Sequence, residues 1–449
     1  MSLSPEMRIS SDMDLPSAMD LPAETSLPPE ITAAFPPPGI PLSPVISNLS
    51  LRFKQVRNIP SLLNLPHKLH VTSGRAAIAL ALEHAGIGPG DQVLIPAFHC
   101  ESMVSPIRWR NAEPVFYQVH RNTHIDLENI KQRLTPACKA IIATHYFGFM
   151  QDFRPLRQWC DEVGIIFIED CAHAFFGKTQ GLGASQTGAA ELVVGQSGDY
   201  AIASSMKFFP MYDGGLLASN KHQLGDIALK KPPLTIDIKS MVNTLERAIS
   251  YGRLGWVGWC LSKVMAAKNF LWQRLKSSTK LESNGPSSSE GAYGLDENWI
   301  HVATTRTSKH ILQHCDIDRI AHYRRRNYQL LDAALGQLPG VRPLFPSLPE
   351  HCVPLVYPLY FEHPERHFRT LKELGVPIWR FGEFLDPLVS SQEFPHSKDL
   401  SRHVFQFPCH QELLNRELDW MIQHVKASLT HSLQEEPHGL DSIPRQRVC

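Results

Sequence analysis

The sequence has no excess of charge of either sign. Its 44 basic side chains balance 44 acidic ones, so no overall field attracts nucleic acid or an anionic membrane. It also lacks an apolar run long enough to span a bilayer, and its N-terminus lacks the basic and apolar regions of a secretion signal. These absences predict a soluble protein that recognises its partners through local groups, without nucleic acid among them, and the scattered cysteines considered next favour the reducing cytoplasm.

Several common site motifs are also missing. The nine cysteines are odd in number, scattered and form no CxxC pair, which argues against a disulfide framework and a zinc knuckle. The stretch "GQSGD" does not fit the GxSxG of a serine hydrolase, and "GKTQGLG" lacks the spacing of a dinucleotide-binding loop. His363 and His367 share a helix face but have no evident third ligand, so we expect no metal site.

Composition divides the chain into five segments. Residues 1–48 are rich in Pro, Ser and Met, which predicts a disordered leader. Residues 49–220 have the pattern of a large α/β domain, and 221–300 that of a helical insertion with a flexible loop. Residues 301–430 predict a smaller α+β domain, followed by a loose tail over 431–449.

Short apolar runs alternate with helical patterns in the large domain. The runs are "HKLHVTSG", "DQVLIPA", "EPVFYQV", "CKAIIATHY", "GIIFIED", "GDYAIASS" and "GGLLAS". Strands that alternate with helices predict a mostly parallel sheet covered on both faces. The ligands of such a sheet bind at the carboxyl ends of its strands.

The insertion is rich in aromatic residues. Such side chains could lie in a membrane interface when basic residues flank them. The aromatic residues are Trp256, Trp259, Phe270 and Trp272, and the basic ones Arg253, Lys263, Lys268 and Arg274. This pattern is more often a helix packed on its own domain or on a twin subunit, so we expect no membrane contact.

One lysine stands among aromatic and small residues in "SSMKFFPMYDGG", residues 204–215. In an apolar pocket Lys207 would lose hydration, which lowers its pKa toward the neutral amine, a nucleophile. The alternative is a surface lysine whose stem covers Phe208 and Phe209.

A candidate anion site opens the first long helix. The stretch "TSGRAAIALAL" places Ser73 and Gly74 at a helix start, where free N–H groups and the helix dipole attract an anion such as phosphate. Ser204, three residues before Lys207, could bind the same phosphate. As an ordinary N-cap, Ser73 would need no ligand.

The run "FIEDCAHAFFG" ends a strand with Asp170, and His173 follows three residues later. A carboxylate at this strand end points into the ligand crevice, where it could keep a pyridine nitrogen protonated, and the histidine could reach a phenolic oxygen on the same ring. A helix cap with a satisfied histidine is the alternative. The stretch "THYFG" over 144–148 ends another strand, where packing and ligand contact are equally open.

In their order and spacing these segments resemble the DegT/DnrJ/EryC1/StrS family of pyridoxal-phosphate aminotransferases. The resemblance covers about residues 65–425 and is carried by "SGRAA", "GDQVLIPAFHC", "THYFG", "EDCAHAFFG", the lysine before "DGG", and "LSRHVFQFPCHQEL". It implies an aspartate-aminotransferase-like fold with a large domain around a mostly parallel sheet and a smaller C-terminal domain. It also implies pyridoxal 5'-phosphate as cofactor and a homodimer with its active sites near the interface.

The resemblance also implies roles for individual residues. Lys207 matches the catalytic lysine that holds the cofactor as a Schiff base and moves the proton between substrate and cofactor. Asp170 matches the partner of the pyridinium nitrogen, and His173 falls where the family has His or Gln near the phenolic oxygen. The phosphate-binding positions are matched by Ser73, Gly74 and Ser204.

The sequence departs from the family at three places. The loop before Lys207 is shorter than usual, which argues against Ser204 as a phosphate ligand but leaves the match of Lys207 unchanged. Where many members have Thr and then a ring-stacking aromatic, this chain has His99 and Cys100, so His99 or Phe98 would have to take that role. The family's "GxNxR" appears as "VATTR", which keeps Arg306 and replaces the Asn that reaches the neighbouring subunit's cofactor with Thr304.

Arg306 is the candidate substrate residue. A guanidinium near the cofactor could pair bidentately with a carboxylate or phosphate of the donor or acceptor. A salt bridge at a helix start is the alternative.

The resemblance predicts an aminotransferase that works by ping-pong exchange. L-Glutamate is the expected amino donor, and the acceptor is a keto group on a nucleotide-linked sugar or a related cyclic ketone, as in polysaccharide or secondary-metabolite pathways. One rival is a non-catalytic or regulatory protein that kept the fold. Another is a sugar dehydratase, but relatives with that activity have lost the lysine, so Lys207 favours transamination.

Overall fold

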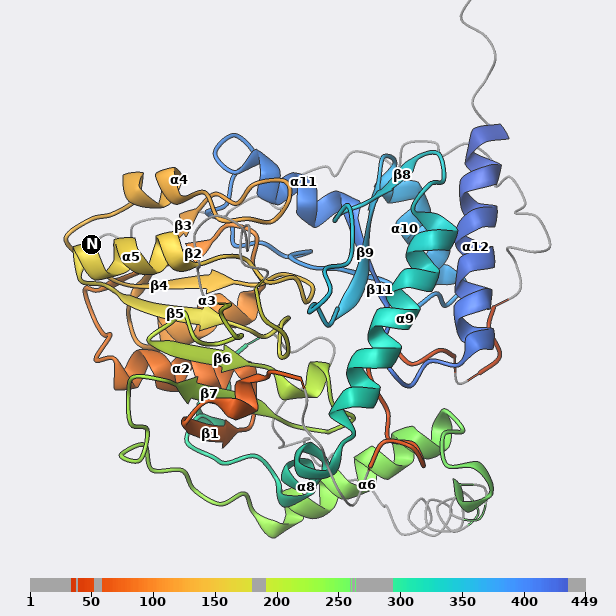
Figure 1. Cartoon of the computed structure of the whole chain (residues 1–449), viewed down its shortest axis with the longest axis horizontal. Coiled ribbons are helices and arrows are strands. Elements are labelled where there is room, and N and C mark those ends of the chain that lie inside the picture. The colour runs from red at the N-terminus through yellow and green to blue at the C-terminus, as the bar shows by residue number, and fades with distance from the viewer. Residues whose placement is uncertain are drawn as a thin grey trace, which may run out of the picture.

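A computed structural model of the chain describes residues 34–37, 39–51, 59–179, 191–258, 260, 263 and 294–434. Two sheets organise this part of the chain (Figure 1). The larger sheet is built from the first half of the sequence and the smaller one from the second half, so the predicted division into a large and a small domain describes the architecture.

The seven-stranded sheet is mostly parallel, as predicted. Its strands lie in the order β1-β7-β6-β5-β4-β2-β3, and β7 alone of the seven runs against its neighbours. The strands are β1 (His67–Val71), β2 (Gln92–Pro96), β3 (Glu113–Tyr117), β4 (Cys138–Thr144), β5 (Ile166–Asp170), β6 (Tyr200–Ala203) and β7 (Gly215–Ser219). Each of the seven apolar runs seen in the sequence forms one of them.

Helices cover both faces of this sheet because the central strands are apolar on both sides. On β2, Leu94 faces one apolar core, while Val93 and Ile95 face the other. Helix α5 packs on the first side and α2 with α3 on the second. The helices are α2 (Gly74–His84), α3 (Glu101–Trp109), α4 (Leu127–Gln132) and α5 (Arg154–Val163).

The smaller sheet is antiparallel, with strand order β10-β11-β9-β8. Its strands are β8 (Val341–Pro343), β9 (Val356–Phe361), β10 (Trp379–Arg380) and β11 (Val404–Pro408). The helices of this half are α9 (Ile317–Leu335), α10 (Pro364–Glu373), α11 (Pro395–His403) and α12 (Asn415–Gln434). Helix α9 begins where the Asp316 carboxylate accepts a hydrogen bond from the Arg319 N–H, 3.0 Å away.

Two further helices, α6 (Leu234–Ser250) and α8 (Arg306–His314), contact each other at the lower edge of the view in Figure 1. The buried positions Ile236, Ser240, Thr244 and Ala248 recur every four residues on α6, as expected for one packed helix face. Short 3₁₀ turns occur at η1 (Leu62–Asn64), η2 (Ser205–Lys207) and η3 (Glu297–Trp299). Among the described helices none has the length and apolarity required to cross a membrane.

The chain ends differ from the predicted boundaries. Ile40 and Val45 are buried, and the Pro41 carbonyl accepts a hydrogen bond from His410 Nε2 at 2.9 Å, so the predicted leader over 1–48 ends within a packed segment. Helix α12 likewise extends past the predicted boundary at 430. The earlier part of the leader, most of the predicted flexible loop, Trp259, Phe270, Trp272 and the end of the tail lie outside the described residues.

Candidate active site

The candidate residues gather at the carboxyl edge of the large sheet. Thr144 ends β4 and pairs in register with Asp170, which ends the parallel strand β5. Strand β6 lies next along the sheet and leads directly into the η2 turn that carries Lys207. Parallel strands bring their carboxyl ends to one edge, which is why residues far apart in the sequence meet there.

Asp170 is held by hydrogen bonds from two sides. Its carboxylate accepts from the Ala172 N–H at 2.8 Å and from Thr144 Oγ1 at 3.1 Å. Burial raises the pKa of Asp170, and these hydrogen bonds together with nearby Lys207 act in the opposite direction. A buried carboxylate without a direct cationic contact among the described residues is suited to a cationic partner supplied by a ligand.

Lys207 is partly exposed to solvent, and the pKa of its amine is lowered. Burial lowers the pKa of its amine, Arg75 lowers it further, and Cys100 and Asp170 act in the opposite direction. Part of the side chain remains accessible, whereas the neighbouring Phe208 and Phe209 are fully buried. The neutral amine of Lys207 therefore forms more readily than that of an exposed lysine.

His173 lies in an aromatic environment. Its ring is stacked with Phe147 at a centroid distance of 5.9 Å and makes an edge contact with Phe381 at 4.8 Å. Its Nδ1 accepts a long hydrogen bond of 3.5 Å from the Phe147 N–H. Burial, and then the charge of Lys207, lower the pKa of His173 well below its usual value. The ring is thus neutral, with Nε2 as its proton donor.

His99 has a different environment from the other candidates. Its Nδ1 donates to the Ala97 carbonyl at 3.0 Å, its Nε2 accepts from the Asp386 N–H at 3.1 Å, and its ring stacks on Phe116 at 4.9 Å. Both nitrogens and one ring face are therefore engaged, which argues against His99 as the stacking partner of a cofactor. The thiol of Cys100, the next residue, raises the pKa of Lys207 and so opposes the effect of burial.

The predicted phosphate site has a close-packed backbone. Ser73 caps α2 by accepting from the Ala76 N–H at 3.2 Å, which is the ordinary capping role. A Cβ placed on Gly74 would lie 3.3 Å from the Cβ of Ser204 and 3.5 Å from the Ala203 carbonyl oxygen. The start of α2 thus packs against the end of β6, next to the lysine turn. Ser204 is 9% exposed, and its hydroxyl has no hydrogen-bond partner among the described residues.

Arg306 lies at the first position of α8. Its backbone N–H donates to Asp237 Oδ1 at 2.6 Å, and its guanidinium Nε lies 3.6 Å from Asp237 Oδ2. The side chain is 79% exposed. Within one subunit this is the arrangement of the alternative interpretation, a salt bridge at a helix start. A contact with the site of a second subunit stays a prediction.

Asp213 was not identified from the sequence as a functional residue. Its contacts give a structural role to Thr304 and Thr305 of the "VATTR" segment. Its fully buried carboxylate accepts from Thr304 Oγ1 at 2.8 Å, Thr305 Oγ1 at 2.6 Å and Ser308 Oγ at 2.6 Å. It also accepts from the Thr305 N–H at 2.9 Å. The residue that replaces the family's Asn thus ties the "DGG" turn to the start of α8.

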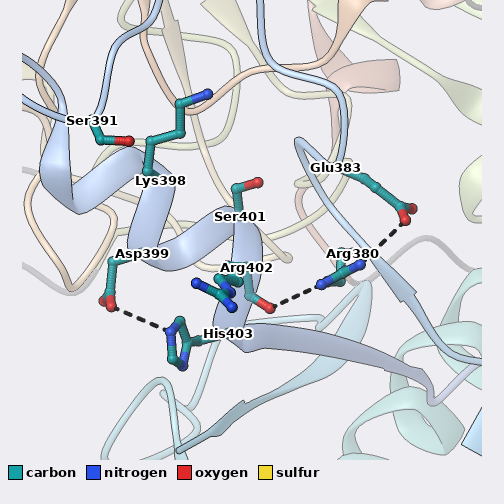
Figure 2. A pocket seen from close by; sticks show the side chains of 8 residues that line it. All are labelled: Arg380, Glu383, Ser391, Lys398, Asp399, Ser401, Arg402 and His403. Carbon is teal, nitrogen blue, oxygen red and sulfur yellow. Dashed lines mark hydrogen bonds and ion pairs between the residues drawn. The ribbon is translucent and has the colours of Figure 1, made fainter. Parts of the chain in front are cut away.

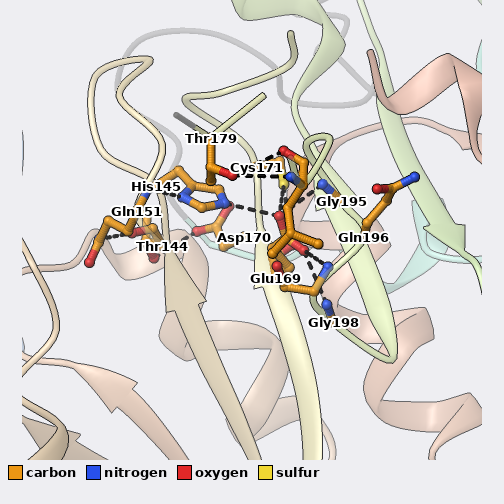
Figure 3. A network of polar contacts seen from close by, with 12 residues as sticks. Thr144, His145, Gln151, Glu169, Asp170, Cys171, Thr179, Gly195, Gln196 and Gly198 are labelled. Atoms are coloured by element: carbon orange, nitrogen blue, oxygen red, sulfur yellow. Dashed lines mark hydrogen bonds and ion pairs between the residues drawn. The ribbon is translucent and has the colours of Figure 1, made fainter. Parts of the chain in front are cut away.

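A second network was also missed from the sequence (Figure 3). His145 Nε2 donates to Glu169 at 2.9 Å, and His145 Nδ1 accepts from the Gln151 N–H at 3.0 Å. Glu169 also accepts from the N–H groups of Gly195 and Ser197, both at 2.8 Å. Burial opposes ionisation of Glu169, but the hydrogen bonds from His145 and the backbone lower its pKa overall. The sequence offered one signal for this network, the two consecutive acids Glu169 and Asp170 at the end of β5. Because neighbouring residues of a strand face opposite sides, only one of the two acids can face the ligand side and the other must find partners elsewhere.

The same network includes Cys171, and the ligand atoms of His145, Glu169 and Cys171 lie within 4.8 Å of one another. Both nitrogens of His145 are already used in hydrogen bonds, and Glu169 accepts several backbone N–H groups. The cluster is therefore satisfied as a structural network without a metal ion.

A cavity of about 420 Å³ lies beside α11 in the small domain (Figure 2). Lys207, Asp170 and His173 are not among its lining residues. Its arginines are neutralised locally: Arg380 and Arg402 both pair with Glu365, at 3.4 and 2.9 Å, and Arg380 also pairs with Glu383 at 3.4 Å. The cavity is distinct from the cluster at the large sheet.

The sequence and the fold were compared with those of known proteins. Residues 56–238 match the sequence profile of the DegT/DnrJ/EryC1/StrS aminotransferase family. Over this segment, which is less than half of the chain, the sequence is similar to that family. The profile match contains Lys207, Asp170 and the other candidates of the large sheet, whereas Arg306 lies beyond it.

Individual members of the DegT/DnrJ/EryC1/StrS family give further comparisons. GDP-perosamine synthase of Vibrio cholerae is 32% identical over 37% of this chain and 44% of its own length. L-Glutamine:2-deoxy-scyllo-inosose aminotransferase of Streptomyces kanamyceticus is 35% identical over 26% of this chain and 28% of its own. The chain thus aligns with less than half the length of these relatives.

The fold extends further than the sequence similarity. The PLP form of the putative sugar aminotransferase Spr1654 from Streptococcus pneumoniae superposes with a TM-score of 0.57 at 17% identity. This superposition covers 88% of the present chain and 99% of the Spr1654 chain. The likeness of fold to that structure therefore extends over the small domain, although the sequence profile ends before it.

The residues present fit pyridoxal phosphate. Lys207 offers an amine of lowered pKa, and Asp170 offers a buried carboxylate for a cationic ring nitrogen. The Gly74 backbone and the unpartnered Ser204 hydroxyl lie at the start of α2, where the helix dipole favours a phosphate. The aldehyde, the ring nitrogen and the phosphate of the cofactor thus each have a matching group in this chain.

Proposed function

We propose that this protein is a pyridoxal-phosphate-dependent aminotransferase that transfers an amino group from L-glutamate to a keto acceptor. The observation that carries the proposal is the presence of an amine of lowered pKa, Lys207, and the buried carboxylate of Asp170 at the same edge of the sheet, where adjacent strands end. When bound, pyridoxal phosphate would supply the electron-accepting ring through which the amino group passes.

The chain's own groups would act as follows. Lys207 would hold the cofactor and, once released, move a proton to and from the substrate carbon, because its lowered pKa favours the neutral amine. Asp170 would keep the ring nitrogen protonated, and His173 would donate from Nε2 to the ring's phenolic oxygen. The start of α2, with Ser73 and Gly74, and Ser204 would bind the phosphate.

The aromatic residues would exclude water from the reaction. Phe147 and Phe381 pack on His173, and Phe98 packs on Phe381 at a centroid distance of 5.0 Å. A low dielectric around the amine and the carboxylate strengthens their electrostatic effect on a bound ligand.

The proposed acceptor is a keto sugar nucleotide or a related cyclic ketone. The names of the two relatives support this class, since one is a GDP-sugar synthase and the other acts on an inosose. The name of the second also makes L-glutamine the donor to compare with L-glutamate. We further propose a cytoplasmic homodimer in which Arg306 reaches toward the partner's site.

A spectroscopic titration tests the proposal. Purified protein loaded with pyridoxal phosphate should show a visible absorption band, and L-glutamate or L-glutamine should bleach it. A keto acceptor of the right class should then restore the band. A loaded protein whose spectrum responds to none of a panel of amino donors would instead support the non-catalytic alternative. Loss of water from a hydroxylated sugar without transfer of nitrogen would support the dehydratase.

A further inference from the structure

The guanidinium of Arg324, on α9, is fully buried although its described contacts include no carboxylate. Its Nε donates to Gln411 Oε1 at 3.1 Å, and Nη1 donates to the carbonyls of Leu355 and Pro354 at 2.8 and 3.2 Å. Its Nη2 donates to the carbonyl oxygen of Lys207 at 2.9 Å. A buried cation is therefore satisfied by neutral acceptors, one of which is the backbone of the candidate catalytic lysine.

The local structure around the lysine explains why these donors are needed. Lys207 ends the three-residue turn η2, and carbonyls at the end of a helical turn have no partner within it. Arg324 satisfies the Lys207 carbonyl, and Gln411 Nε2 satisfies the next one, that of Phe208, at 3.0 Å. The Arg324 guanidinium also lies over the Phe208 ring, 4.7 Å from its centroid. Two side chains that come from the C-terminal half of the chain thus fix two consecutive peptide groups at the lysine.

The same arginine is connected to the histidine side of the site. The Leu355 N–H, in the segment whose carbonyls Arg324 binds, donates to the Phe147 carbonyl at 2.8 Å. A Cβ on Gly148, which has a φ of +100°, would lie 2.6 Å from the Leu355 nitrogen, so the two backbones are in close contact. Phe147 in turn packs on His173.

We propose that Arg324 is a positioning residue that sets the place of the Lys207 amine relative to Asp170 and His173, with Gln411 as its partner. This inference rests on the proposed function for the importance of the amine. Lysine cannot replace arginine here, because one ammonium group cannot reproduce the planar fork that reaches Gln411, Leu355 and Lys207 together. Burying the guanidinium costs free energy, and the hydrogen bonds that it makes there hold the backbone of the reactive lysine in place.

The chain contains a matched control on the same helix. Arg325 is partly buried and donates from Nη1 to the carbonyls of Pro349 and Cys352, both at 2.6 Å, without a hydrogen bond to the lysine turn. Arg324→Lys and Arg325→Lys therefore make the same chemical change, and both remove arginine bonds to backbone carbonyls. They differ in whether the backbone of Lys207 loses a hydrogen bond.

The first measurement uses the protein without added cofactor. Competitive acetylation across a pH series, followed by mass spectrometry of the peptide that carries Lys207, gives the pKa of this amine. Arg324→Lys should raise that pKa by about one unit or more toward the ordinary lysine value, since a loosened turn is better hydrated. Arg325→Lys should leave it unchanged. An unchanged Lys207 titration in folded Arg324→Lys would overturn the proposal.

Gln411→Leu is the milder variant if Arg324→Lys does not fold. Hydrogen exchange of the segment 204–209 should then be faster than in Arg325→Lys, and equal exchange would overturn the proposal. In the loaded enzyme, kcat should fall tenfold or more with a smaller change in donor KM, because the amine and not the donor site is displaced. A protein that binds no pyridoxal phosphate would refute the proposed function and leave the amine titration as an independent test of Arg324.

Discussion

Thr144 donates a hydrogen bond of 3.1 Å to Asp170 between the adjacent ends of two parallel strands. The two residues are 26 positions apart, and their contact depends on the in-register pairing of β4 with β5. Burial raises the pKa of Asp170 above its ordinary value. The hydrogen bond from Thr144 opposes this effect, because it favours the ionised carboxylate. Thr144 therefore helps to maintain the charge that a protonated ring nitrogen requires.

We expect Thr144→Val to raise the pKa of Asp170 further, because the buried carboxylate loses one of its two hydrogen-bond donors. The visible band of the loaded protein should then change at a higher pH than in the wild type, and kcat should fall by about tenfold. The control is Thr135→Val, since the Thr135 hydroxyl binds Gln92 at the surface. Identical pH profiles for the two variants would show that Thr144 does not influence Asp170.

Asp170→Asn should lower kcat by about 10²-fold or more, the effect of removing a preorganised electrostatic group. The amide keeps the size of the side chain and its acceptor oxygen, so the Ala172 hydrogen bond can persist. Cofactor binding, measured by fluorescence titration, should weaken less than turnover. A variant with wild-type turnover would refute the assignment of Asp170.

Lys207→Ala should abolish covalent attachment of the cofactor. Borohydride reduction of the loaded wild type, followed by peptide mapping, should place the label on Lys207 and leave Lys178 and Lys221, which pair with Glu191 and Asp199, unlabelled. Turnover should fall by at least about 10²-fold, the usual contribution of a positioned proton-transfer group. A label found on another lysine, or normal turnover by the variant, would refute this role.

Arg306→Lys distinguishes the two interpretations of this residue. As a salt bridge with Asp237 at an exposed position, Arg306 contributes less than about 1 kcal/mol to the free energy of unfolding. If it reaches the partner's site, the variant should raise the donor KM several-fold while the spectrum of the loaded protein stays unchanged. Unchanged KM and kcat together with a dimer in sedimentation would remove Arg306 from the site.

His99 should make the protein less stable in mild acid. The pKa of His99 is lowered to about 4, mainly by burial; Arg108 and Lys398 act in the same direction, and the Ala97 carbonyl and Asp386 oppose them. The unfolded chain, with an ordinary pKa near 6.5, then binds more protons between these values, so stability is complete above about pH 6.5 and is lost as the pH falls toward 4. The loss from this one group is on the order of 3 kcal/mol.

His99→Asn is the comparison for that experiment. Asparagine can keep a donor for Ala97 but does not titrate, so the variant's free energy of unfolding in urea should fall less steeply from pH 7 to pH 4.5 than that of the wild type. Other buried histidines, such as His367 and His410, contribute equally to both proteins. Equal slopes would show that His99 titrates normally.

The sequence by itself determined the strands and the mostly parallel sheet, and its motifs indicated the family that residues 56–238 resemble. Each apolar run became a strand because both faces of the central strands are buried, and the resemblance identified Lys207 and Asp170 at ends of those elements. Local pattern is enough for such features, since hydrophobic periodicity and strand direction fix where a strand ends and which edge binds a ligand.

Only the tertiary structure decided the contacts between distant segments. The sequence could not show that Arg324 binds the carbonyl of a lysine 117 positions away, or that Asp213 ties its turn to Thr304 and Thr305. The sequence also could not show whether the His99 ring would stack on a ligand or, as in the structure, on the ring of Phe116. Such contacts depend on how two sheets and their helices pack, because a buried polar group takes whichever partner the packing places within hydrogen-bond distance.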